Sequence, residues 1–109
     1  MSRKKAPFKN YEGKKSNDKH IRLTADMMTN KKFLNLSNSS KVLYMYMKLW
    51  ALGNEEFEYA ETLSNKFMSK ATFYKARDEL IDSGFIKIIA TNKFAHIPNK
   101  YKFSSNWRD

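Results

Sequence analysis

The side chains best suited to chemistry gather at the beginning of one segment, SKATFYKARDELID, residues 69–82. Lys70 and Lys75 supply positive charge, Thr72 supplies a hydroxyl group, and Ser69 can contact a phosphate while capping a helix. Cations interleaved with hydroxyl donors are typical of surfaces that bind phosphates. The segment therefore predicts a contact surface for an anionic partner.

A helix over this segment would separate the basic cluster from an apolar face. At about 100° per residue, Phe73, Ala76 and Leu80 share a face that we expect to pack inward, with Arg77 and Ile81 at its border. The outer surface is small and basic near its N-terminal end and acidic near its C-terminal end. This order opposes the helix macrodipole, so it favours contact with phosphates rather than stability. An ordinary solvated helix face is the alternative interpretation.

A long apolar helix is expected to support this cluster. Serines precede the segment KVLYMYMKLWAL and Gly53 follows it, which indicates a capped helix that ends at a glycine. Leu43, Tyr46, Met47 and Trp50 recur at helical spacing, so we expect them to face the core.

Shorter elements are expected on both sides of the long helix. Ile21 and Leu23 suggest a short strand, and Thr24 can cap a short helix after it. Residues 55–59 alternate polar and aromatic side chains, which is typical of an edge strand. The segment AETLSNKF then predicts a short second helix.

A β-hairpin is expected after the helix of residues 69–82. Gly84 ends that helix, and residues 85–89 begin a strand whose partner is predicted at residues 100–104. The intervening residues 90–99 form a long loop that carries Lys93 and His96. The elements together predict an α+β fold, mainly α, with a hairpin after its last helix.

Composition allows one domain and argues against several kinds of site. The 109 residues are 41% hydrophobic and 15% aromatic, enough for one modest core. The chain has no cysteine, two distant histidines and only three glycines, so thiolate metal sites, disulfides and glycine-rich phosphate loops have no basis. We therefore expect no cofactor, no metal site and no enzymatic activity.

The net charge of +10 lies at the two ends of the chain. Residues 1–22 hold eight Lys or Arg against two acids, residues 23–62 four against five, and residues 63–109 nine against four. This distribution suits a polyanion, because each neutralised phosphate releases counterions, although lysines that only maintain solubility are the simpler alternative. We expect a basic flexible arm at residues 1–20 and a folded domain at residues 21–109, with no secretory signal or membrane span and a cytoplasmic location.

Three segments resemble bacterial winged helix-turn-helix DNA-binding domains. The run SKATFYKARDELIDSGFIKI resembles a recognition helix followed by the first strand of a wing. The run MMTNKKFLNLSNSSKVLYMYMKLWA is similar to the first helix of such modules in plasmid replication initiators and related mobile-element proteins of Gram-positive bacteria. The ending NKYKFSSNWRD resembles the strand that closes the wing. The resemblance covers residues 21–107 and implies a three-helix core with a C-terminal β-hairpin wing.

The resemblance implies binding of double-stranded DNA by a replication or transcription regulator of a mobile element. The helix would enter the major groove, where lysine can donate to guanine and threonine can contact a thymine methyl group. The wing and the arm would contact the DNA backbone or a minor groove. The candidate contact residues are Ser69, Lys70, Ala71, Thr72, Tyr74 and Lys75 in the helix, Lys93 and His96 in the wing, and Arg3, Lys4, Lys5, Lys14 and Lys15 in the arm. A homodimer and other replication or transcription proteins are compatible partners.

Two other hypotheses remain open. A winged helix can act as a protein interaction module, and exposed Phe57, Tyr59 or Trp107 could then seat a partner chain or a second copy. The basic arm could instead bind an anionic membrane surface, although Phe8 and Tyr11 are its only apolar anchors. Single-stranded nucleic acid, stacked on aromatic side chains such as Tyr44, is a minor alternative.

Overall fold

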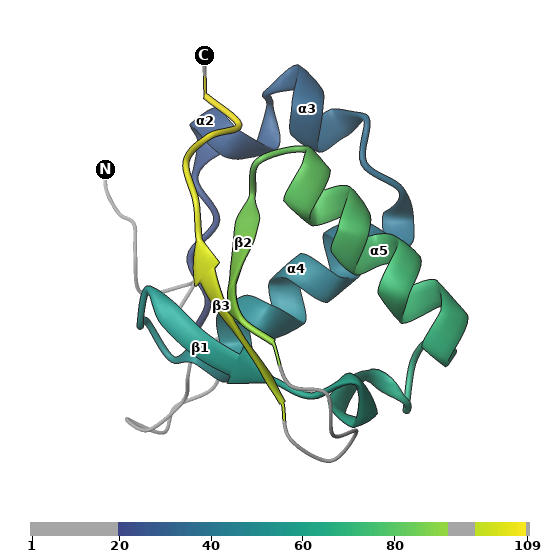
Figure 1. Cartoon of the computed structure of the whole chain (residues 1–109). Coiled ribbons are helices and arrows are strands. Elements are labelled where there is room, and N and C mark those ends of the chain that lie inside the picture. The colour runs from purple at the N-terminus through teal and green to yellow at the C-terminus, as the bar shows by residue number, and fades with distance from the viewer. Residues whose placement is uncertain (1–19, 92–97, 109) are drawn as a thin grey trace, which may run out of the picture.

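Two long helices pack against each other and against a three-stranded antiparallel sheet (Figure 1). The computed structural model describes residues 20–91 and 98–108. The expected α+β class is confirmed, with helices and sheet both contributing to the core. The helices and strands are α2 (Ala25–Met28), α3 (Lys31–Leu34), α4 (Asn38–Ala51), β1 (Glu56–Tyr59), the 3-10 helix η1 (Glu61–Ser64), α5 (Lys70–Asp82), β2 (Ile86–Ala90) and β3 (Asn99–Phe103).

The sheet has the order β1-β3-β2, so the last strand of the chain lies in its centre. The predicted hairpin is confirmed by β2 and β3, whose register places Ile86 opposite Phe103. The predicted edge strand is confirmed by β1, in which Phe57 lies opposite Tyr101 and stacks on Phe103 with ring centroids 4.6 Å apart. Alternation in β1 buries its aromatic side chains and exposes its acids, as a strand with one solvated face requires.

The long helix α4 is central to the core, but it turns a different face inward than its periodicity predicts. Leu43 and Met47 are fully buried as expected, whereas Tyr46 is 44% exposed and Trp50 is 54% exposed. Tyr44 is buried in their place, edge to face with the rings of Phe33, Phe85 and Phe103. The prediction was wrong because Lys48 is the only polar residue between Val42 and Ala51, so periodicity alone cannot choose between two overlapping stripes.

Gly84 does more than end α5. The amide groups of Gly84 and Phe85 donate to the carbonyl groups of Ile81 and Leu80, which closes the helix end in a Schellman arrangement. Gly84 has a φ of +88°, and a Cβ atom there would lie 2.7 Å from the backbone nitrogen of Trp107. The glycine therefore permits the C-terminal segment to cross this corner, where the Trp107 ring stacks on Phe85.

Two of the shorter elements differ from expectation. Residues 20–24 have no regular structure, so the short strand predicted at Ile21 and Leu23 is absent, while Thr24 does cap α2. Within the segment AETLSNKF only Glu61–Ser64 is helical, as the 3-10 helix η1 rather than an α-helix. A buried hydrogen bond of 2.9 Å between the hydroxyl groups of Tyr59 and Ser64 holds η1 against β1.

Candidate nucleic-acid interface

The first turn of α5 brings together the predicted contacts Ser69, Lys70, Ala71 and Thr72. The Ser69 hydroxyl oxygen accepts from the Thr72 backbone nitrogen at 3.1 Å and donates to the Thr72 side-chain oxygen at 2.9 Å. These bonds confirm the predicted cap and fix the orientation of both hydroxyl groups. Lys70 and Ala71 are exposed and Thr72 is half-buried, so the turn presents a small, basic surface.

The buried face of α5 determines which side chains point outward. Phe73, Ala76 and Leu80 are buried, as their spacing predicts. Lys75 therefore lies on the exposed side of the helix, one turn beyond Ala71. Tyr74 is 37% exposed, with its ring edge to face with Phe73 at 5.1 Å between centroids. Ser69, Lys70, Ala71, Thr72, Tyr74 and Lys75 thus belong to one accessible end of the helix.

Arg77 is engaged within the protein. Its guanidinium group bonds the Asp78 carboxylate at 2.8 Å and lies 4.9 Å from the centre of the Tyr74 ring. Burial disfavours the charged form of Arg77, but hydrogen bonds to Asp78 and Tyr101 outweigh burial and raise its pKa. Arg77 therefore remains charged and contacts Tyr74 and Asp78, rather than serving as a free contact for an anion.

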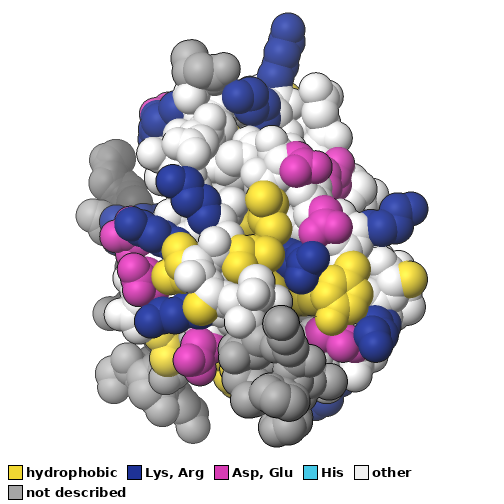
Figure 2. All heavy atoms as spheres, in the orientation of Figure 1, with side chains coloured by type: hydrophobic (Ala, Val, Ile, Leu, Met, Phe, Trp, Pro, Cys, Tyr) yellow, Lys and Arg dark blue, Asp and Glu magenta, His cyan; other side chains and the backbone are white. Residues whose placement is uncertain are grey.

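An open groove of about 610 Å³ runs beside α5. Thr72 and Lys75 line one part of it, and Asp78, Glu79 and Asp82 line another. Figure 2 views the side of the molecule on which α5 lies and shows basic, acidic and hydrophobic side chains mixed over it. The charge thus changes sign along α5, and only its N-terminal end suits an anionic partner.

Glu79 fixes α5 against the beginning of α4. Its Oε1 atom accepts from the Ser37 backbone nitrogen at 3.1 Å, from the Ser37 hydroxyl at 2.9 Å and from the Ser40 hydroxyl. Burial opposes ionisation of Glu79, but these donors outweigh burial and lower the pKa of its carboxyl group. The carboxylate also lies at the positive end of the α4 macrodipole. Sequence analysis missed this contact, because its partners are 42 residues apart.

The lysines of the hairpin are largely occupied. Lys100 lies 3.6 Å from the Glu56 carboxylate and Lys102 lies 3.6 Å from the Glu55 carboxylate. Alternating glutamates in β1 and lysines in β3 were the available signal for this pairing. Lys87 is exposed on β2 and was not predicted as a contact. The predicted wing residues Lys93 and His96 lie outside the described residues, as do Arg3, Lys4, Lys5, Lys14 and Lys15 of the arm.

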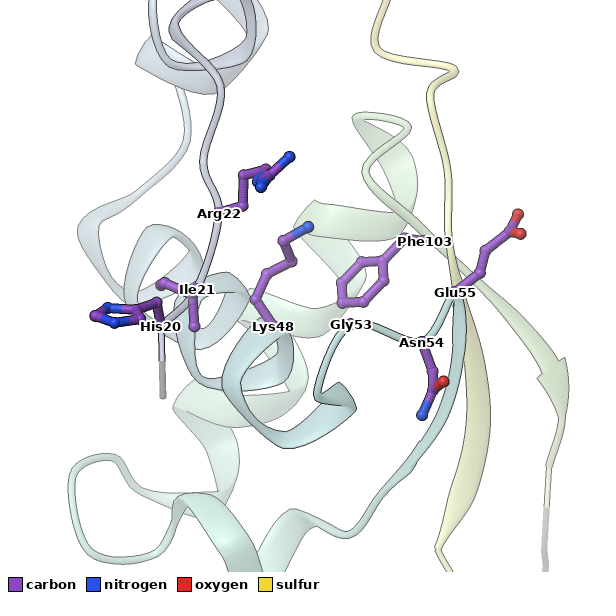
Figure 3. A pocket seen from close by; sticks show the side chains of 8 residues that line it. All are labelled: His20, Ile21, Arg22, Lys48, Gly53, Asn54, Glu55 and Phe103. Atoms are coloured by element: carbon purple, nitrogen blue, oxygen red, sulfur yellow. The ribbon is translucent and has the colours of Figure 1, made fainter. Parts of the chain in front are cut away.

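A second basic site lies where residues 20–22 pass the end of α4 (Figure 3). This pocket has a volume of about 520 Å³, and Arg22 and Lys48 extend into the same side of it. The Lys48 ammonium group lies 4.9 Å from the centre of the Phe103 ring, and burial together with the charge of Arg22 lowers its pKa. Glu55 also lines the pocket, and sequence analysis did not single out either cation.

The aromatic residues predicted to seat a partner do not do so. Phe57, Tyr59 and Trp107 are at most 6% exposed, so the prediction that they form a docking surface was wrong. Each belongs to β1 or to the C-terminal segment and packs in the hydrophobic core. Burial also raises the pKa of the Tyr59 hydroxyl group. Tyr44 is buried as well, and burial raises its pKa to about 12.

Two features are absent from the described residues. Within residues 20–91 and 98–108, histidines and acids nowhere form a group of three that could hold a metal ion. In the same part of the chain, the helices are all too short or too polar to cross a membrane.

Comparison with known proteins does not assign this chain to a family. No protein-family model matches the chain, and searches of curated proteins and of solved structures found no match.

Proposed function

We propose that this protein is a winged helix-turn-helix protein that binds double-stranded DNA through the N-terminal half of α5. The accessible cluster of Lys70, Thr72 and Lys75 on a helix whose opposite face is buried is the observation that carries the proposal. A helix exposed in this way can enter a major groove with its first turns. The net charge of +10 would draw the protein toward DNA without regard to sequence.

The order of elements supports the winged-helix part of the proposal. Helix α4 is followed by a strand, a short helical turn, helix α5 and a hairpin, and the early strand β1 pairs with the last strand β3. In this arrangement η1 and α5 would form the helix-turn-helix, and the loop between β2 and β3 would form the tip of the wing. The sequence resemblance to mobile-element proteins suggests replication or transcription control as the process.

The clamp between Glu79 and α4 supports the proposed role of α5. A recognition helix must keep its angle to the rest of the domain when it meets the groove, because misplaced contacts lose their geometry. Glu79 holds the C-terminal half of α5 to Ser37 and Ser40, away from the basic first turn. The same carboxylate lies away from the basic end, so it does not neutralise Lys70.

A salt titration on duplex DNA tests the proposal. Binding of the full chain to a mixed-sequence duplex should weaken steeply as salt increases, because phosphate contacts release counterions. A chain without residues 1–20 should keep part of this slope if α5 and the hairpin contact phosphates. Undetectable duplex binding at low salt by folded protein would overturn the proposal.

Single substitutions test the contact surface. On a site selected from random duplexes, Lys75→Ala should lose about tenfold to a hundredfold in affinity, the range of one base contact. Lys31→Ala removes the same charge from exposed α3, at the far end of the molecule from the first turn of α5 (Figure 1), and should lose less than about twofold. Equal losses for both variants would show that only net charge matters.

Thr72→Ala separates base recognition from phosphate binding. The threonine methyl group can contact thymine, so its loss should reduce discrimination between the selected site and a scrambled duplex. Affinity for the scrambled duplex should stay within about twofold, because the substitution removes no charge. A uniform loss on both duplexes would contradict the role of Thr72 in base recognition.

A further inference from the structure

The outward face of α4 carries an apolar stripe that Phe67 covers in part. Tyr46, Leu49 and Trp50 are 44%, 41% and 54% exposed, and Val42 and Met45 are partly exposed on the same side. Phe67 extends the stripe, because its ring stacks on Tyr46 with centroids 4.3 Å apart. The apolar stripe is defined as Val42, Met45, Tyr46, Leu49, Trp50 and Phe67. Large contiguous apolar surfaces of this kind mark interaction sites.

The stripe is free of charge along the whole length of α4. The helix has two charged residues, Lys41 and Lys48, which border the stripe beside Met45 and are engaged by other parts of the protein. The Lys41 ammonium group donates to the Leu34 carbonyl at 3.3 Å, and the Lys48 ammonium group lies over the Phe103 ring. A charge-free surface on a chain of net charge +10 offers no contact to phosphates or acidic peptides. Its partner must itself present an uncharged, apolar face.

We propose that the apolar stripe is the interface between two copies of this chain. Across a two-fold axis the same face meets itself, so an uncharged stripe needs no other complementary surface. In this dimer the two α4 helices would pack antiparallel, with the two-fold axis near Met45 and Tyr46. The large side chains Leu49 and Trp50 of one copy would then lie against the smaller Ser39 and Val42 of the other. Large side chains would then fill the space above small ones at both ends.

The size of the stripe determines how tight the contact can be. An aromatic side chain presents roughly 150–250 Å² when fully accessible, and those of the stripe are about half exposed, so each copy would bury on the order of 500 Å². The total of about 1,000 Å² lies at the low end of specific interfaces. The dimer is therefore weak, and Trp50 and Tyr46 are its expected energetic centre, since tryptophan and tyrosine dominate such contacts.

This interface comes near the proposed DNA contact at Phe67, which lies two residues before Ser69 in the chain. The stripe lies on α4, which passes behind β2 in Figure 1. Lys70, Thr72 and Lys75 belong to α5, where both lysines are exposed and Thr72 is half-buried. If the proposed function is correct, two copies would bind a site with two-fold symmetry. If it is not, the dimer remains.

Sedimentation equilibrium of the full chain from micromolar to millimolar concentration tests the inference. The mass should rise from the 12.9 kDa of one chain toward twice that value. Leu49→Lys should abolish the rise, because it places a charge in the middle of both faces. Leu34→Lys introduces the same change at an exposed leucine of α3, outside the stripe, and should leave the rise unchanged. Circular dichroism confirms that each variant is folded.

Cross-linking tests the geometry. The chain has no cysteine, so Met45→Cys introduces a single thiol next to the predicted axis, and Leu34→Cys introduces one away from it. Under mild oxidation Met45→Cys should form a disulfide-linked dimer at least about tenfold faster than Leu34→Cys. A chain that stays monomeric at millimolar concentration, or equal cross-linking of both variants, would overturn the inference. Loss of duplex binding with the dimer intact would instead count against the proposed function alone.

Discussion

Helices α4 and α5 have nearly the same length and the same kind of cap, yet they face solvent with opposite chemistry. Each begins at a serine whose hydroxyl oxygen accepts a backbone N–H, and each is followed by a glycine with a positive φ. Outside the core, α4 exposes uncharged apolar side chains, whereas α5 exposes lysines and acids. The difference gives one small core two surfaces of different chemistry.

The charged residues of the two helices also differ in how they contribute to the stability of the fold. The lysines of α4 pack over aromatic rings, and its first turn receives the carboxylate of Glu79. Lys70 and Lys75 of α5 lie in solvent at the positive end of a helix dipole. Charges placed against the dipole, without a structural contact in the described residues, point to a use outside the folded monomer.

Among the substitutions, those at the two glycines that follow these helices should differ most in their effect on the free energy of unfolding. Both have a φ near +88°, which costs an alanine about 1 kcal/mol. A Cβ atom at Gly53 meets nothing within 4 Å, whereas one at Gly84 meets the Trp107 backbone at 2.7 Å. Gly84→Ala should therefore lower the free energy of unfolding by about 3 kcal/mol and Gly53→Ala by about 1 kcal/mol, measured by urea denaturation. Equal losses would show that the tail does not constrain Gly84.

Removal of the Glu79 carboxylate, which joins α5 to α4, should have the next largest effect on stability. Glu79→Ala removes the acceptor for three donors at the start of α4, one of them on buried Ser40, and should cost about 2 kcal/mol at neutral pH. Asp82→Ala removes an exposed carboxylate from the same helix and should change stability by less than about 0.5 kcal/mol. Similar losses in both variants would contradict the clamp.

The clamp should also depend on pH. The pKa of Glu79 is lower in the folded chain than the ordinary value of 4.5, so its ionised form stabilises the fold. This contribution is fully present above pH 4.5, declines as pH falls below that value, and is lost once pH passes the lowered folded pKa. The stability difference between the wild type and Glu79→Ala should shrink over this range. A constant difference would show that Glu79 acts through packing alone.

The cap of α5 should contribute less. Ser69→Ala leaves the Thr72 amide without its acceptor and should cost about 1 kcal/mol. Ser39→Ala removes a hydroxyl from the first turn of α4 and should be neutral or stabilising by a few tenths of a kcal/mol, since alanine favours helix. If the two variants lose the same stability, Ser69 is not acting as a cap.

Substitution of Lys75 should have the smallest effect on stability, and substitution of Lys48 should have a larger one. Lys75→Ala should change the free energy of unfolding by less than about 0.5 kcal/mol, because the side chain is exposed. Lys48→Ala should cost about 1 kcal/mol, because it removes the packing of Lys48 over the Phe103 ring. Thermal unfolding of both variants at one salt concentration measures the difference. A larger loss at Lys75 would give that lysine a structural role.

Local signals were enough to predict most elements and part of the candidate site. The caps at Ser37 and Ser69 and the stop at Gly84 act within a few residues, so they are visible in the sequence. The inward face of α5 was also predictable, because polar residues occupy its other sides. The outward position of Lys75 follows from that face, with Lys70 and Thr72 on the flanks of the helix.

Tertiary structure decided the features that depend on distant partners. The inward face of α4 required the rings of Phe85 and Phe103 to select Tyr44 over Tyr46, since the helix is apolar nearly all round. The contact of Glu79 with Ser37 and the passage of residues 106–107 over Gly84 join segments far apart in the chain. The sequence by itself determined where α4 and α5 begin and where α5 ends, because caps and glycine stops are local signals. Which surfaces remain exposed was decided by packing, because only contacts across the core settle which apolar side chains are buried.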